Sequence, residues 1–123
     1  MPATIWCIYR VDNCRHTHPP KFKYVFIVCR DEDYWGFLVN SAINQFICRK
    51  PHLFACQILL RQSDYRFLVR DSFLDCSQLY PFTNDELMFG LGTIPDATKA
   101  EIKIAVSVAK TIEKRYRDLI LSS

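Results

Sequence analysis

The chain has 123 residues and carries 16 Lys and Arg against 13 Asp and Glu, a formal charge of +3. Half of its residues are hydrophobic, enough to build the core of a single domain over residues 1–123 without disulfides. No run of eighteen apolar residues occurs, so we expect no membrane span. The N-terminal segment lacks the pattern of a signal peptide, and the sequence therefore favours a cytoplasmic protein.

The charge is distributed unevenly along the chain. Residues 1–70 contain ten Lys and Arg against five Asp and Glu, whereas residues 71–123 contain six against eight. The net charges of the two parts are therefore +5 and −2. A basic N-terminal part suits a polyanion such as RNA, although many soluble proteins show a similar asymmetry.

The six cysteines are expected to be free thiols. Most of them lie inside apolar runs such as "IWCIY" and "FIVCR", where cysteine behaves as a small buried hydrophobic residue. Without an export signal, a reducing compartment is the better expectation. The six are Cys7, Cys14, Cys29, Cys48, Cys56 and Cys76.

The first two-thirds of the chain is predicted to form short strands. Residues 4–11 alternate in hydrophobicity, and residues 22–29 are nearly all apolar or aromatic, which predicts a central strand buried on both faces. The stretch "RDEDYWG" predicts a charged turn, after which residues 37–40 return as the second strand of a hairpin. Residues 42–48 fit either a short strand or one turn of helix. Further strands are expected at 57–60, at 67–69 and near 73–79.

The C-terminal third is predicted to be one long amphipathic helix over about 96–121. Thr98 and Glu101 fit a capping box, with Asp96 as the competing N-cap. The strands before it suit a small antiparallel barrel over about 1–94, which the helix covers. The apolar stripe that predicts the helix, at spacings of three and four, is Ile102, Ala105, Val106, Ala109, Ile112, Tyr116, Leu119 and Ile120.

Three stretches carry a resemblance to a known family. They are "KYVFIV" from Lys23, "GFLVNS" ending at Ser41, and "SFLDCSQLYPF" followed by Gly92-Thr93-Ile94 and the final helix. In this order they resemble the PemK/MazF-like toxins of type II toxin–antitoxin systems, which are SH3-like barrels with a C-terminal helix. The resemblance implies an endoribonuclease that needs neither metal nor cofactor. It further implies a homodimer and an antitoxin protein that neutralises the toxin.

The resemblance also implies a reaction and its catalytic residues. A 2′-hydroxyl of single-stranded RNA attacks the adjacent phosphate and leaves a cyclic phosphate and a 5′-hydroxyl. Lys23 matches the family's arginine and would stabilise the phosphate, although lysine cannot bind it through a bidentate fork. Ser41 matches the family's hydroxyl residue and would position the phosphate. The family's Gly-rich loop is replaced by "RHTHPPKF", which brings the imidazole of His18 near the cation as a proton-transfer group.

Basic and aromatic residues elsewhere are candidate RNA contacts. Trp35 is expected to be exposed because it lies in the predicted charged turn, and an exposed ring can stack on a base. Lysines beside a strand end can also serve only to discourage edge pairing, and arginines can form an ordinary solvated face. The predicted RNA-binding residues are Arg15, Lys21, Trp35, Arg49 and Lys50.

Other interpretations of the sequence stay open. Cys14-x-His16-x-His18 is half of a zinc site, but no second pair at metal-binding spacing completes it, and we expect no metal. A non-catalytic SH3-like binding module of phage or bacterial origin is the main alternative to a nuclease, because a fold does not fix a function. A structural protein whose C-terminal helix docks a partner is the third.

Overall fold

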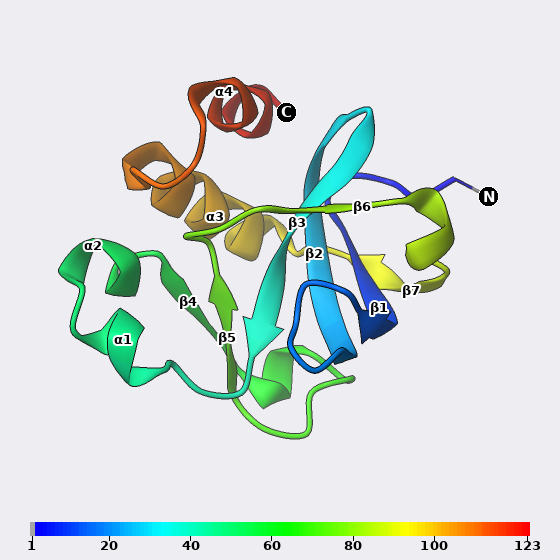
Figure 1. Ribbon diagram of the computed structural model, residues 1–123, viewed down its shortest axis with the longest axis horizontal. Coiled ribbons are helices and arrows are strands. Elements are labelled where there is room, and N and C mark those ends of the chain that lie inside the picture. The colour runs from blue at the N-terminus through cyan, green and yellow to red at the C-terminus, as the bar shows by residue number, and fades with distance from the viewer. Residues whose placement is uncertain (1) are drawn as a thin grey trace.

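The computed structural model describes residues 2–123 and shows an α+β fold (Figure 1). A seven-stranded antiparallel sheet has the order β4-β5-β3-β2-β1-β7, with β6 paired to β3. Two short helices leave the sheet between β3 and β4, and two longer helices end the chain. The strands are β1 (Cys7–Cys14), β2 (Lys21–Asp31), β3 (Asp33–Asn40), β4 (Gln57–Leu60), β5 (Ser72–Asp75), β6 (Tyr80–Phe82) and β7 (Phe89–Thr93), and the helices are α1 (Gln45–Cys48), α2 (Pro51–Phe54), α3 (Asp96–Val108) and α4 (Lys114–Ser122).

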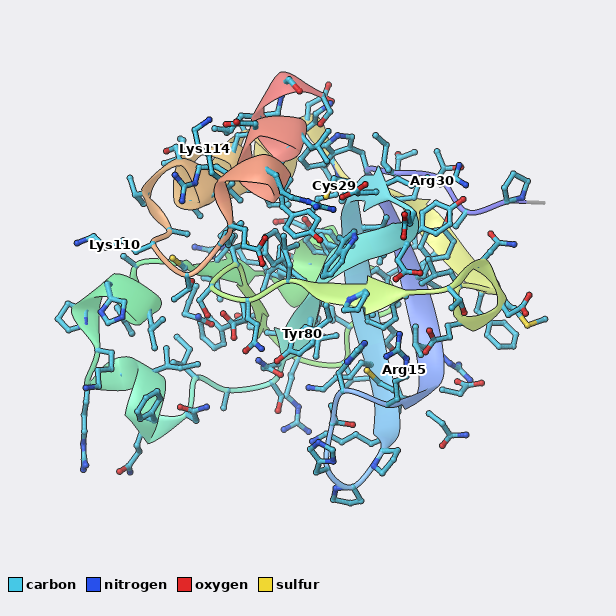
Figure 2. All side chains as sticks on the ribbon, turned by 45° about the horizontal axis from the view of Figure 1, so that its top comes forward. Arg15, Cys29, Arg30, Tyr80, Lys110 and Lys114 are labelled. Atoms are coloured by element: carbon cyan, nitrogen blue, oxygen red, sulfur yellow. The ribbon has the colours of Figure 1, made fainter. Side chains whose placement is uncertain are left out.

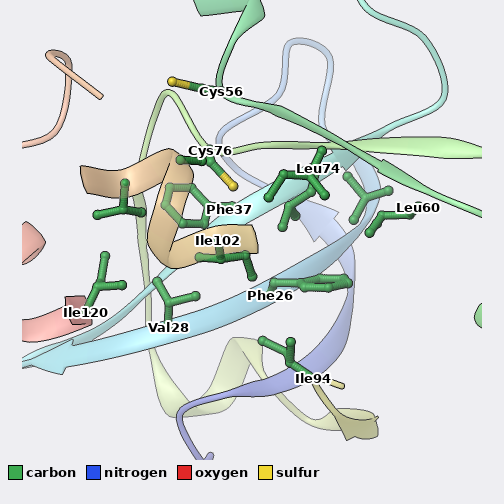
Figure 3. Packing of buried hydrophobic residues seen from close by; sticks show 14 of the residues in the cluster. Phe26, Val28, Phe37, Cys56, Leu60, Leu74, Cys76, Ile94, Ile102 and Ile120 are labelled. Carbon is green, nitrogen blue, oxygen red and sulfur yellow. The ribbon is translucent and has the colours of Figure 1, made fainter. Parts of the chain in front are cut away.

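Strand β2 is the centre of the sheet. The burial on both faces that is predicted for residues 22–29 is confirmed from Val25 to Cys29 but is wrong for Phe22, which is 54% exposed. Its residues from Val25 to Cys29 are at most 2% exposed. Side chains alternate along a strand, so β2 contributes to two clusters of buried residues. Phe26 and Val28 pack in the cluster that includes residues of α3 and α4, whereas Val25 and Ile27 pack in the cluster that includes Phe82 of β6. Figure 3 shows Phe26 and Val28 beside Ile102 of α3.

The predicted hairpin after β2 is confirmed, but its turn is much tighter than "RDEDYWG" indicates. Asp31 pairs with Asp33, and Glu32 alone forms the turn, with φ of 62°. Strand β3 therefore begins at Asp33. Gly36 lies within it at a close approach to β2, where an added Cβ would stand 2.7 Å from the carbonyl oxygen of Phe26.

The prediction of a closed barrel is wrong, because the sheet is open. Strands β4 and β7 are its two ends, and no pairing joins them within residues 2–123. Helix α3 contacts β4 at this end of the sheet. The predicted strand at 67–69 is also wrong, since this segment is a turn that begins with a hydrogen bond from the Leu68 amide to the Tyr65 carbonyl. The predicted strand at 57–60 is confirmed as β4.

The prediction of one helix over 96–121 is wrong, because the helix breaks at 109–113. Ala109 turns away with ψ of 113°, and α4 then packs its own buried residue, Ile120, into the core. Two tertiary contacts hold the break: the Arg117 guanidinium donates to the carbonyls of Ala109 and Ile112, and the Thr111 hydroxyl donates to the carbonyl of Ser77. No helix within residues 2–123 is long and apolar enough to cross a membrane.

The predicted capping box at the start of α3 is also wrong. The helix begins at Asp96 after Pro95, and no side chain caps its N-terminus. The hydroxyl of Thr98 instead shares a hydrogen bond of 2.5 Å with the phenol of Tyr65. The hydroxyl therefore ties α3 to the segment before β5.

The cysteines are all free, and most are buried, as the apolar runs around them indicate. Burial raises the pKa of Cys29 to about 12 and raises the pKa of Cys76 well above its ordinary value. These thiols are therefore poor nucleophiles, because the thiolate is the reactive form. The free buried cysteines are Cys14, Cys29, Cys56 and Cys76.

Candidate functional site

The first four residues of β2, "KFKY", separate two adjacent clefts. The first, called here the polar cleft, has a volume of about 620 Å³ and is lined by His16, His18, Lys21, Lys23, Asn40 and Tyr80, among others. The second, called here the aromatic cleft, has a volume of about 280 Å³ and is lined by Lys21, Phe22, Lys23, Tyr24, Ser41 and Phe67, among others. Lys21 and Lys23 line both clefts, so they form the ridge between them.

The ammonium of Lys23 is half-buried and is held by neutral oxygens. Its Nζ donates to Oδ1 of Asn40 at 2.6 Å and to the carbonyl of Val39 at 3.1 Å. Burial lowers the pKa of Lys23, and the neighbouring charge of Lys21 lowers it further. No ion pair found within residues 2–123 involves Lys23. An ammonium has three donors, so one N–H remains for a ligand.

Strand register explains why Asn40 meets Lys23. In the β2–β3 hairpin Val25 pairs with Leu38, and the same antiparallel register, carried on by two residues, brings Lys23 opposite Asn40. The family resemblance indicates the next residue, Ser41, and the sequence did not lead us to expect Asn40. The predicted hairpin, continued in register as far as Lys23, is the feature of the sequence that indicates Asn40.

Two histidines reach the polar cleft from the loop between β1 and β2. His16 lies 4.9 Å from the ring of Tyr80, and its Nε2 is 2.7 Å from the carbonyl of Pro81. Because a carbonyl only accepts, Nε2 of His16 must carry the proton in this contact. His18, the predicted proton-transfer residue, is exposed in the same cleft as Lys23.

The three predicted catalytic residues are divided between the two clefts. His18 and Lys23 line the polar cleft, whereas Ser41 and Lys23 line the aromatic cleft. Lys23 is thus the common member, and the ridge that it forms with Lys21 separates the hydroxyl of Ser41 from the imidazole of His18.

Two predicted RNA-binding residues are engaged within the fold. Arg15 pairs with Glu86 at 3.2 Å and donates to the carbonyl of Pro81 at 2.9 Å; Figure 2 labels it near Tyr80. The prediction that Trp35 is exposed is wrong: it lies in β3, half-buried, with its ring 4.4 Å from that of Tyr116 in α4. A helix about eighty residues further along the chain therefore covers part of this ring.

The other predicted RNA-binding residues are accessible. Lys21 is exposed on the ridge between the clefts. Arg49 and Lys50 are exposed between α1 and α2, and Nζ of Lys50 lies 5.7 Å from the ring centre of Phe46, which lines the polar cleft. Lys50 is therefore next to a residue of the polar cleft, although neither Arg49 nor Lys50 lines the cleft itself.

The half zinc site is not assembled. Cys14 is fully buried, while Nε2 of His16 is engaged by the carbonyl of Pro81. Within residues 2–123 no three side chains of His, Cys, Asp or Glu gather closely enough to hold a metal ion.

No known protein family matches the chain, and no curated protein matches it either.

Proposed function

We propose that this chain binds single-stranded RNA along the ridge of Lys21 and Lys23 and cleaves it without a metal, as the PemK/MazF-like toxins do. The observation that supports this most is the Lys23 ammonium, half-buried at the junction of two clefts and held by uncharged partners. Asn40 and Val39 orient the charge without cancelling it, which leaves it to attract a phosphate.

The proposed role of Lys23 is to stabilise the negative charge that develops on the phosphate oxygens. A donor fixed before the reaction needs no reorganisation when the charge appears, and a water-poor surrounding strengthens the interaction. Lys21, exposed beside it, adds a second positive charge that attracts the RNA backbone. Ser41 donates its hydroxyl to a phosphate oxygen from the side of the aromatic cleft.

The proposed proton transfers use the polar cleft. His18 accepts the proton of the 2′-hydroxyl as its oxygen bonds to phosphorus. The bond from phosphorus to the 5′-oxygen breaks, and this oxygen takes a proton from the Lys23 ammonium. The lowered pKa of Lys23 favours that release. His18 then releases its proton to solvent, and Lys23 takes up a proton from solvent.

The proposed partners follow from the resemblance. They are a second copy of the chain and an antitoxin that covers the polar cleft. The exposure of Phe46 supports the proposal of a protein partner that covers the polar cleft, because this side chain lines the cleft and is 65% exposed. A protein segment that buried Phe46 would at the same time block access to Lys23.

A non-catalytic binding module is the second candidate. Two of the three donors of Lys23 are already used within the fold, and Ser41 and His18 lie in different clefts. This arrangement retains a phosphate-binding ridge but divides the groups that the reaction needs.

A cleavage assay in the presence of a chelator separates the two candidates. The purified chain is incubated with single-stranded RNA and EDTA, and the ends of the products are analysed. We expect cyclic phosphates and 5′-hydroxyls, and a loss of rate of about 100-fold or more for Lys23→Gln. Lys114→Gln, which removes an exposed lysine of α4, is the control and should keep full activity.

Two results would contradict the nuclease. RNA binding that depends on Lys23 without any cleavage would establish the binding module. Cleavage that is equal in the native chain and in Lys23→Gln would place the reaction at another site.

A further inference from the structure

The aromatic cleft has no part in the proton transfers described above, yet it is built from three rings in a row. The ring of Phe22 meets that of Tyr24 edge to face, at 5.4 Å and 76°. Tyr24 in turn lies 4.6 Å from Phe67 and donates its hydroxyl to the carbonyl of Phe67 at 3.2 Å. The wall of the cleft is therefore fixed before any ligand arrives, and binding to it requires little ordering of side chains.

We propose that the aromatic cleft binds one nucleobase of the RNA, stacked on Phe22, while the phosphate of the same nucleotide lies on Lys21 and Lys23. This inference rests on the proposed function and adds a base-binding subsite to it. Lysines alternate with rings along "KFKY", and Lys21 and Lys23 line the aromatic cleft together with Phe22 and Tyr24. Cations and rings thus occupy one short segment at the end of β2.

The chemistry of the cleft fits a base better than an aliphatic side chain. Phe22 is 54% exposed, so a flat ring can cover it, and aromatic stacking accepts any base. The rim is polar and cationic: Arg70 and Ser41 line it together with the two lysines of the ridge. A base attached to a phosphate places its planar part on the rings and its negative part on the ammonium groups.

The size of the cleft sets a further limit. Its volume of about 280 Å³ lies just below the usual range for drug-sized ligands, and therefore suits a single base with part of its ribose. Ser41, proposed above as a donor to a phosphate oxygen, lines this cleft and can contact the base as well. Its hydroxyl can both donate to and accept from the polar edge of a stacked base.

Three small probes test the base subsite apart from RNA cleavage. They are adenosine 5′-monophosphate, ribose 5-phosphate, which has the same phosphate without the base, and adenosine, which has the base without the phosphate. Binding is followed by NMR of the side chains of Phe22, Tyr24 and Phe67. We expect adenosine to shift these signals, and adenosine 5′-monophosphate to bind at least tenfold more tightly than ribose 5-phosphate.

Single substitutions show which side chains bind the base and which bind the phosphate. Phe22→Ala should weaken adenosine 5′-monophosphate about tenfold and leave ribose 5-phosphate unchanged, because Phe22 is exposed and its loss leaves the core intact. Lys23→Gln should weaken both phosphates. Phe54→Ala removes a ring on α2 that is 49% exposed and lines neither cleft, and it should change nothing.

The outcomes separate the subsite from the nuclease. If adenosine leaves the three aromatic residues unchanged, or if the two phosphates bind alike, the base subsite is wrong even where RNA is cleaved. If adenosine binds on Phe22 while RNA is not cleaved, the nuclease is wrong and the base subsite stands.

Discussion

The side-chain oxygen of Asn40 accepts a hydrogen bond of 2.6 Å from the ammonium of Lys23. The two residues lie opposite each other at the open end of the β2–β3 hairpin. The carbonyl of Val39, which precedes Asn40 in β3, accepts a second hydrogen bond from the same ammonium. Neutral partners fix the position of the cation and leave its charge uncompensated. A carboxylate in the place of Asn40 would fix the cation equally well and cancel its charge.

The substitution Asn40→Asp tests this relationship directly. The new carboxylate pairs with Lys23, so we expect the affinity for single-stranded RNA to fall at least tenfold while the fold is retained. Fluorescence anisotropy with a labelled RNA measures the affinity. Asn13→Asp, an exposed site on β1, changes the net charge equally and should have a much smaller effect. An equal loss in both variants would mean that total charge matters and the Lys23–Asn40 pair does not.

Gly36→Ala should strongly destabilise the fold. The added Cβ would stand 2.7 Å from the Phe26 carbonyl oxygen and 2.8 Å from a methyl group of Val25, both in the centre of the sheet. Overpacking of this kind costs about 1–3 kcal/mol, and a backbone contact places the cost near the upper end. Urea denaturation measures it. At Gly90 an added Cβ has 3.7 Å to its nearest contact, on Tyr9, so Gly90→Ala should change stability far less.

Arg117→Ala should also destabilise the protein, through the break between α3 and α4. The guanidinium donates to the carbonyls of Ala109 at 3.2 Å and Ile112 at 2.9 Å, and its loss leaves these acceptors unpaired. We expect a decrease of about 1–3 kcal/mol in the free energy of unfolding. Lys114→Ala, which breaks only an exposed ion pair in α4, should cost less than about 0.5 kcal/mol. Equal effects would show that the break needs no capping by Arg117.

Glu86 should make the stability depend on pH in the acid range. Burial opposes its ionisation, but the backbone N–H of Thr83 and the Arg15 guanidinium outweigh burial, so the pKa of Glu86 is lowered from 4.5. A carboxyl with a lowered pKa in the folded state adds stability above its unfolded pKa and loses it as the pH falls through the folded value.

The comparison of the native chain with Glu86→Gln measures this contribution. We expect an advantage of about 1 kcal/mol for the native chain at pH 6, which disappears progressively below pH 4.5. An advantage that is constant from pH 6 to pH 3 would show that the hydrogen bonds of Glu86 do not depend on its charge.

The sequence predicted the elements whose pattern is local. Strands β2 and β4 can be predicted from their apolar segments alone, because a buried strand requires only hydrophobic side chains over the length of a strand. It missed the break at 109–113, since Ala109 and Ile112 continue the apolar stripe and no Gly or Pro interrupts it. That break depends on Arg117 and on the contact of Thr111 with Ser77, which the chain makes only once it is folded.

The residues of the site were also predicted only in part, because a local pattern does not show contacts between distant segments. Lys23 and His18 were found from the "HPPKFKY" stretch, and the structure places both in the polar cleft. Trp35 was misjudged because its cover, Tyr116, comes from a distant helix. Asn40 was not predicted although the hairpin register indicates it, because the family resemblance points to a hydroxyl residue, and this led to Ser41 beside it.

The proposed function depends on the binding of an RNA phosphate by the Lys23 ammonium at the junction of the two clefts. The most direct measurement is an NMR titration of the chain with single-stranded RNA that carries 2′-O-methyl groups and so cannot be cleaved. We predict that the side-chain signals of Lys23 and Asn40 shift together and that both shifts fall steeply as salt is raised. Saturation of the RNA complex with the Lys23 and Asn40 signals unmoved would contradict the account.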